Sequence, residues 1–306
     1  MNKKAKLTLI VLTAGFLLCT AAYVILVTVF TDMNTGFLHR EYRLAGNLLF
    51  FGIGAAAAAA AIFTARADSK NGLMTENFSG GKTAVLGILM LVMALCAAFE
   101  GVSEIKAFSP SIFLMVSDFA GAAAMAVIGF VTLSGKIMKP GVGFSCSFAA
   151  LYFVAKAIYS FIDHMVITAV PEYLTGTLAA AFGAVFLALT AKVLSGNGEK
   201  NTKSALCFWG VGTVVLNLSS GIGIMLSKLI APTEISSMIT PSVYRAEEYY
   251  ETTAGGYMMT FMPYVNLALG VFAAAFIIML FVRGNTPAEV SEVPAGTESS
   301  GDGSAE

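Results

Sequence analysis

The sequence predicts an all-α, polytopic membrane protein with about eight transmembrane helices arranged as four helical hairpins. Apolar runs of about 20 residues recur along the chain, and each is long enough to cross about 30 Å of hydrocarbon as a helix. Only 12% of the 306 residues are charged and 57% are hydrophobic, whereas a soluble domain carries about 25% charged residues. Basic residues also gather in alternate connections between the runs, as expected when helices cross a membrane in alternating directions.

Eight apolar runs fall within residues 1–283, which we expect to form one transmembrane bundle. The third run has a short apolar core, so its helix is expected to include Glu100 near one end. The first run follows three lysines and resembles a signal peptide, but it exceeds the usual apolar length of 7–15 residues, so we expect a retained anchor. The predicted spans lie near 7–30, 44–64, 83–105, 111–133, 142–164, 173–194, 204–227 and 257–282.

The distribution of lysine and arginine predicts that both termini are cytoplasmic and that the protein resides in the cell membrane. With that orientation, twelve basic residues lie on the cytoplasmic side and five on the outer side. Residues 284–306 carry five acidic residues and no lysine, arginine or aromatic residue, which predicts a disordered acidic cytoplasmic tail. The connection 228–256 is the longest and is interpreted either as a lid or as a plain solvated connector.

Small residues predict how the helices pack. The even-numbered spans contain alanine-rich segments, and small residues let helix backbones approach closely inside lipid. Each odd-numbered span holds one cysteine, and the second and third hairpins both end in Leu-Ser-Gly. These similarities suggest duplicated hairpins, although alanine-rich membrane helices are common in any case. The alanine-rich segments are 55–61, 122–126, 179–181 and 273–275.

Two charged residues lie deep within predicted spans. Asp118 is about 12 Å from the outer end of the fourth span, and Lys156 is about 12 Å from the outer end of the fifth. Charges at such depth are costly in a bilayer and are functional candidates by default. Because the two spans are consecutive and antiparallel, we expect these opposite charges to form a pair.

The fifth span carries further polar residues at helical spacing. Tyr152, Lys156, Tyr159 and Asp163 are separated by four, three and four residues, which places them on one face of a helix. We expect this face to look into the bundle, with Lys156 held by Asp118 at its own depth and by Asp163 one to two turns further out.

Other polar groups are expected in the same outer half of the bundle. Asn217 and Asn266 are placed about 10 Å and about 14 Å from the outer ends of their spans, and Glu100 lies near the outer boundary. Serines and glycines at 219–223 and a proline at 263 predict interruptions in the last two spans. Such breaks are typical of transporter binding sites, but they also occur in ordinary kinked packing helices.

The sequence lacks the motifs of common enzymes and of cofactor sites, so we expect no catalytic activity, cofactor or metal. A net charge of −1 argues against nucleic acid as a partner. The preferred interpretation is a transporter or permease for a small polar solute, with a polar cavity in the outer half of the bundle. The alternative is a non-transporting membrane module, such as a sensor or a subunit of a larger complex. The expected partners are the lipid bilayer, a small polar solute or a proton, and another membrane protein.

Overall fold

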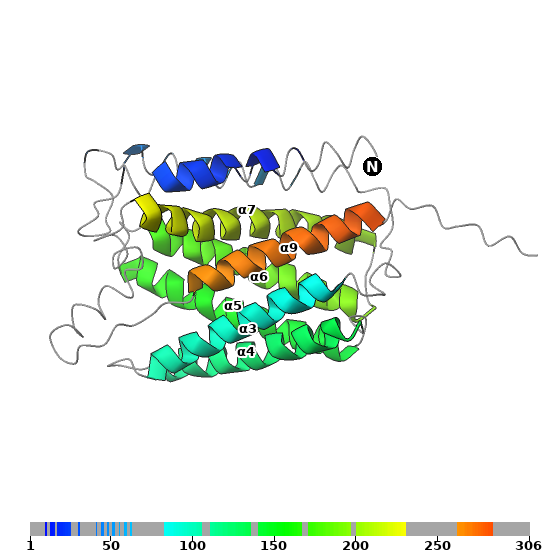
Figure 1. Cartoon of the computed structure of the whole chain (residues 1–306). Coiled ribbons are helices and arrows are strands. Elements are labelled where there is room, and N and C mark those ends of the chain that lie inside the picture. Colours follow the sequence, from blue (N-terminus) through cyan, green and yellow to red (C-terminus); the bar gives the residue numbers. More distant parts are fainter. Residues whose placement is uncertain are drawn as a thin grey trace, which may run out of the picture.

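Six long helices dominate the computed structural model of the chain (Figure 1). The structure describes residues 83–105, 111–135, 140–166, 171–196, 200–230 and 262–283, together with isolated positions between 10 and 62. Within those residues every regular element is a helix and none is a strand. The helices are α3 (Ala84–Ile105), α4 (Ile112–Leu133), α5 (Pro140–Val166), α6 (Pro171–Leu194), α7 (Lys200–Ile230) and α9 (Met262–Arg283).

All six helices are long and apolar enough to cross a membrane. They coincide with the third to eighth predicted spans, and α3 includes Glu100 as expected. The structure therefore supports a multi-pass helical membrane protein. The predicted span 44–64, the loop 231–256 and the tail 284–306 lie largely or wholly outside the described residues, as does part of the span 7–30. The count of eight spans and the four-hairpin arrangement thus remain predictions.

The six helices form a closed ring in chain order. Each packs against the next, from α3 to α4, α5, α6, α7 and α9, and α9 returns to pack against α3. Neighbours are antiparallel, because residues near the start of one helix meet residues near the end of the next. Gly87 near the start of α3 lies against Leu133 at the end of α4, and Gly143 in α5 lies against Ala191 in α6. Figure 1 shows the helix axes running broadly side by side, with α3 and α4 along one edge.

Glycines set the closest approaches between neighbours, as the small-residue pattern predicted. A methyl group added at Gly87 would lie 2.9 Å from the carbonyl oxygen of Gly129, and one added at Gly129 would lie 3.0 Å from that of Gly87. Backbone oxygens cannot move aside as a flexible side chain can, so both positions require glycine for this crossing. The same principle applies between α7 and α9, where a methyl group on Gly270 would meet Leu218 at 2.6 Å.

Aromatic rings fill the half of the ring that contains the start of α7 and the end of α9. Phe186 of α6 contacts Phe272 and Phe276 of α9 edge to face, with ring centroids 6.3 and 5.9 Å apart. All three side chains are at most 2% exposed. This aromatic cluster closes the half of the ring that the charge distribution predicts to be cytoplasmic.

An N-terminal helical segment lies on the outside of this ring. It spans Thr13–Ile25 and buries Cys19 and Tyr23. The hydroxyl of Thr20 donates a 3.4 Å hydrogen bond to Ser219 of α7, and Figure 1 shows the segment in blue beside α7. Because α6, α9 and this segment all cover α7, 72% of its spanning residues are buried, against 39% in α3.

The expected interruptions in the last two helices are not observed. α7 continues as one helix through the serines and glycines at 219–223. Gly221 instead admits α9, since a methyl group there would lie 3.2 Å from the carbonyl oxygen of Pro263. α9 begins at Met262, so Pro263 lies in the first turn, where backbone N–H groups have no helical acceptor to lose. Residues 257–261 lie outside the described residues, so the predicted break of the eighth span at Pro263 stays a prediction.

Local sequence explains how the helices begin and end. Ser111 is the N-cap of α4, and its hydroxyl accepts a 3.4 Å hydrogen bond from the Leu114 N–H. α4 and α6 end in the same way, in Gly135 and Gly196 with φ of 71° and 78°, a conformation that glycine adopts without steric cost. The two Leu-Ser-Gly sequences therefore encode one kind of turn.

Candidate functional site

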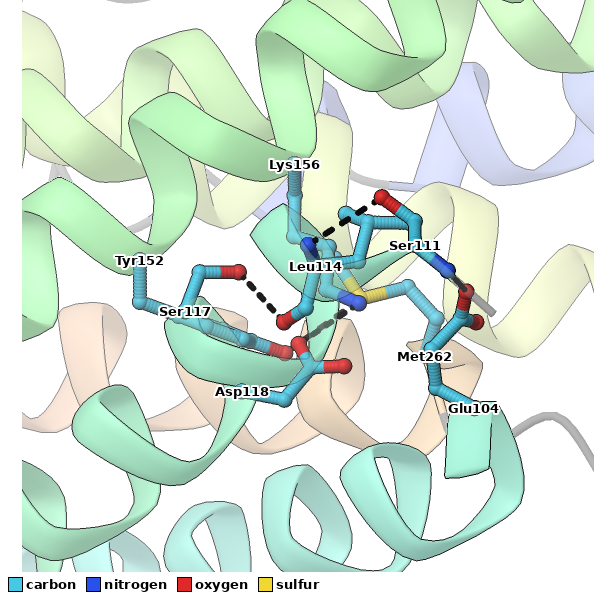
Figure 2. A network of polar contacts seen from close by, with 8 residues as sticks. All are labelled: Glu104, Ser111, Leu114, Ser117, Asp118, Tyr152, Lys156 and Met262. Carbon is cyan, nitrogen blue, oxygen red and sulfur yellow. Dashed lines mark hydrogen bonds and ion pairs between the residues drawn. The ribbon is translucent and has the colours of Figure 1, made fainter. Parts of the chain in front are cut away.

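The predicted charge pair is present at the α4–α5 interface. Lys156 Nζ lies 2.7 Å from Asp118 Oδ1 (Figure 2). The Asp118 side chain is 1% exposed and that of Lys156 is 11% exposed. Asp118 is in the second turn of α4 and Lys156 is in the C-terminal half of α5, so the antiparallel packing brings them to one level. This ion pair is the centre of the candidate site.

Tyr152 joins the ion pair to α9. Its side chain is 1% exposed and lies one helical turn from Lys156, whose Nζ is 5.6 Å from the centre of the phenol ring. The Tyr152 hydroxyl donates a 3.7 Å hydrogen bond to the sulfur of Met262, the first residue of α9. Gly121 of α4 makes room for the ring, because a methyl group there would meet Tyr152 Cγ at 2.6 Å. Three helices thus converge at this point (Figure 2).

α3 places acidic residues beside the pair. A methyl group on Gly101 would lie 3.2 Å from Asp118 Cβ, so the backbone of α3 lies against the carboxylate side of the pair. The carboxylates of Glu100 and Glu104, which flank this contact, lie within electrostatic range of Asp118. Glu104 also accepts a 2.8 Å hydrogen bond from the Ser111 N–H and so holds the start of α4 against the end of α3.

Two buried side-chain oxygens, one in the pair and one in α9, have no hydrogen-bond partner among the described residues. Asp118 Oδ1 is occupied by Lys156, but Asp118 Oδ2 accepts no hydrogen bond in this part of the chain. Asn266 Oδ1 is likewise without a donor there, and its residue is 7% exposed. Asn266 lies one turn after Met262, on the same face of α9. Buried acceptors of this kind normally have a partner, and leaving one unpaired costs about 1–3 kcal/mol.

Asn217 has a different role in the described structure. Its amide nitrogen donates 3.1 Å hydrogen bonds to the carbonyl oxygens of Ala179 in α6 and of Thr213 in its own helix. The side chain therefore links α7 to α6. Its Oδ1 atom is buried without a donor among the described residues, but no contact joins Asn217 to the ion pair.

The expectation for the polar face of α5 holds only in part. Tyr152 and Lys156 turn inward, but Tyr159 is 37% exposed and does not look into the bundle interior. The predicted inward orientation is correct for Tyr152 and Lys156, but the buried face of α5 does not extend as far as Tyr159. The side chain of Asp163 lies outside the described residues, so its predicted contact with Lys156 stays a prediction. Glu100 is half-buried beside the site, as expected.

Met262 and Gly121 belong to the site and were not predicted. Gly121 stands next to the alanine-rich segment of α4, three residues from Asp118, so a search for small residues on the face of a buried charge would have found it. Met262 could be recognised only after Tyr152 was placed, because methionines occur throughout the chain. Among the described residues no group of three histidine, cysteine or acidic side chains could hold a metal ion.

Comparisons of the chain with known proteins found no relative. A scan against models of known protein families, a search of curated proteins and a search of solved structures each found no match.

Proposed function

We propose that the protein is a transporter or permease for a small polar solute, and that the Asp118–Lys156 pair is the charged part of its binding site. One observation carries this proposal: the pair is buried within the bundle, and Asp118 Oδ2 beside it has no donor among the described residues. A carboxylate with a free oxygen inside a membrane protein is able to bind a polar group that arrives from outside.

The energetics of buried charges support a role beyond packing. Taking two charges out of water is costly, and well-packed apolar residues in their place are often neutral or stabilising. Lipid-embedded charges are accordingly rare, and they mark solute or proton pathways when they face a bundle interior. Asp118 of α4 is paired with Lys156 of α5 and lies against α3 within the bundle, so this general rule applies to the pair.

In this proposal the two halves of the ring have different tasks. The polar residues around the ion pair bind the solute, and the aromatic cluster of Phe186, Phe272 and Phe276 is the closed barrier on the other side. Transport then requires these rings to separate while the polar half closes.

Uptake into proteoliposomes tests the proposal directly. The full chain would be assayed with radiolabelled methylammonium, glycine, acetate and glycerol, which represent a cation, a zwitterion, an anion and a neutral solute. We expect uptake of at least one of them above protein-free liposomes, and loss of that uptake in Lys156→Met and in Asp118→Asn. Lys192→Met, at the opposite end of the bundle, is the matched control and should transport normally. Uptake that is unchanged in both site variants would refute the assigned role.

The alternative is a non-transporting membrane module, for which the filled interior is the favouring observation. Phe186, Phe272 and Phe276 pack against one another and are buried in their half of the ring. In such a module the ion pair fixes the packing of α4 against α5. Absence of uptake for every solute, together with a loss of thermal stability in a doubly apolar variant of the pair, would favour this alternative.

A further inference from the structure

The candidate site contains more hydrogen-bond acceptors than donors. Asp118 Oδ2 and Asn266 Oδ1 are buried acceptors without a donor among the described residues. Glu100 and Glu104 add negative charge on the α3 side. In that part of the chain the cation at the site is Lys156, and it is already engaged at Asp118 Oδ1. A ligand that complements these acceptor oxygens and acidic side chains has hydrogen-bond donors and a positive charge.

We infer that the solute is a small organic ammonium ion and that Lys156 occupies its position at Asp118 until the solute displaces it. This inference rests on the proposed solute site and names the chemical class that the site takes. The ammonium group of Lys156 is chemically equivalent to an alkylammonium ion tethered to α5.

The contacts of Lys156 show what a free ammonium ion would find. Its Nζ lies 2.7 Å from a carboxylate and 5.6 Å from the centre of the Tyr152 ring, a distance at which an aromatic face attracts a cation. The Met262 sulfur, which accepts the Tyr152 hydroxyl, adds a polarisable apolar surface for the alkyl part. Carboxylate, aromatic ring and thioether together suit a small alkylammonium ion.

Lys156 is able to leave without unfolding its helix. Its side chain is less tightly enclosed than that of Asp118, with 11% exposed against 1%. A lysine side chain has four carbons joined by rotatable bonds, so its ammonium group is able to move several ångströms while the backbone stays in place. Asp118 is held between α3 and α5 and has no comparable freedom.

Other charge classes fit the site less well. A carboxylate or phosphate would have to approach Asp118, Glu100 and Glu104, and like charges in a desolvated site repel strongly. A divalent metal needs several oxygen or nitrogen ligands together, and no such group of three occurs among the described residues. A neutral solute would bring no positive charge to replace that of Lys156 at Asp118.

Calorimetric titration of the full chain in nanodiscs tests the inference, with methylammonium chloride as the probe and sodium acetate and glycerol as comparisons. We expect methylammonium alone to bind. Lys156→Met removes the tethered competitor, so methylammonium should bind this variant at least about tenfold more tightly than it binds the wild type. Asp118→Asn should abolish binding, and Lys192→Met should match the wild type. Equal affinity in Lys156→Met and wild type, or binding retained in Asp118→Asn, would overturn the inference.

A stability measurement keeps the test decisive if Lys156→Met folds poorly. Lys156→Ala leaves space beside Asp118, so methylammonium should raise its melting temperature in a saturable manner, and acetate should not. No rise with methylammonium would contradict the inference. Methylammonium binding without uptake would refute transport and leave the ligand class intact. Uptake of acetate, glycine or glycerol without methylammonium binding would refute the ligand class and leave the transport proposal intact.

Discussion

The ion pair between Asp118 and Lys156 makes a quantitative prediction about stability. Both groups are almost fully removed from solvent, so deleting one partner leaves an uncompensated charge inside the bundle, which costs about 3–5 kcal/mol. Lys156→Met should fall at the upper end of that range, because it strands the 1% exposed carboxylate. Asp118→Leu should fall at the lower end, because the lysine that remains is 11% exposed and can move outward. The double variant removes both charges and should be more stable than either single variant.

Unfolding by sodium dodecyl sulfate in mixed micelles measures these differences. The single tryptophan, Trp209, reports on the α6–α7 contact, because its ring lies 4.8 Å from that of Phe182. Circular dichroism follows the helices in parallel, and coincidence of the two signals checks two-state behaviour. Lys192→Met controls for the loss of a lysine as such. If the losses in the two single variants simply add in the double variant, the two groups are not coupled and the reasoning about the pair is wrong.

Three further predictions concern packing, a helix link and a cap. Gly121→Ala should lower the free energy of unfolding by about 1–3 kcal/mol, because its methyl group would meet the Tyr152 ring at 2.6 Å. Gly141→Ala has nothing within 4 Å of the added methyl group and should be neutral or slightly stabilising. Equal melting temperatures of the two variants would contradict the described packing. Asn217→Leu should lower the free energy of unfolding by about 1–3 kcal/mol, because it removes the hydrogen bond to a backbone carbonyl of α6. The same substitution should alter the tryptophan emission. An unchanged unfolding curve would show that this hydrogen bond contributes nothing to stability. Ser111→Ala should cost about 0.5–2 kcal/mol as an N-cap loss measured by the same unfolding assay, while Ser111→Asp should retain the wild-type value.

Much of the fold could be predicted from the sequence because the bilayer constrains helix length. An apolar run must cover the hydrocarbon thickness, so α3 and α4 each begin within one residue of their predicted starts and end at the predicted residue. The ion pair was predictable for a related reason. Depth follows from counting residues along consecutive antiparallel helices, and an opposite charge at the same depth is the natural partner of Asp118.

The remaining features depend on how the helices pack together, which the number of residues along each helix does not reveal. The exposure of Tyr159 depends on how far α4 and α6 cover α5, and helix spacing carries no information on that. Similarly, the closure of the ring by α9 against α3 joins segments far apart in the chain, and no local pattern encodes that contact.

The order of the helices in the ring has a consequence for biogenesis. Asp118 and Lys156 belong to consecutive helices with a short connection, so the two charges can enter the membrane together and neutralise each other as soon as α5 has been synthesised. Ring closure has to wait much longer, because α9 supplies the contact between α7 and α3. Until α9 inserts, the inward faces of α3 and α7 remain open to lipid. A nascent chain held before α9 is therefore a natural substrate for an insertion chaperone, while its most costly charges are already paired.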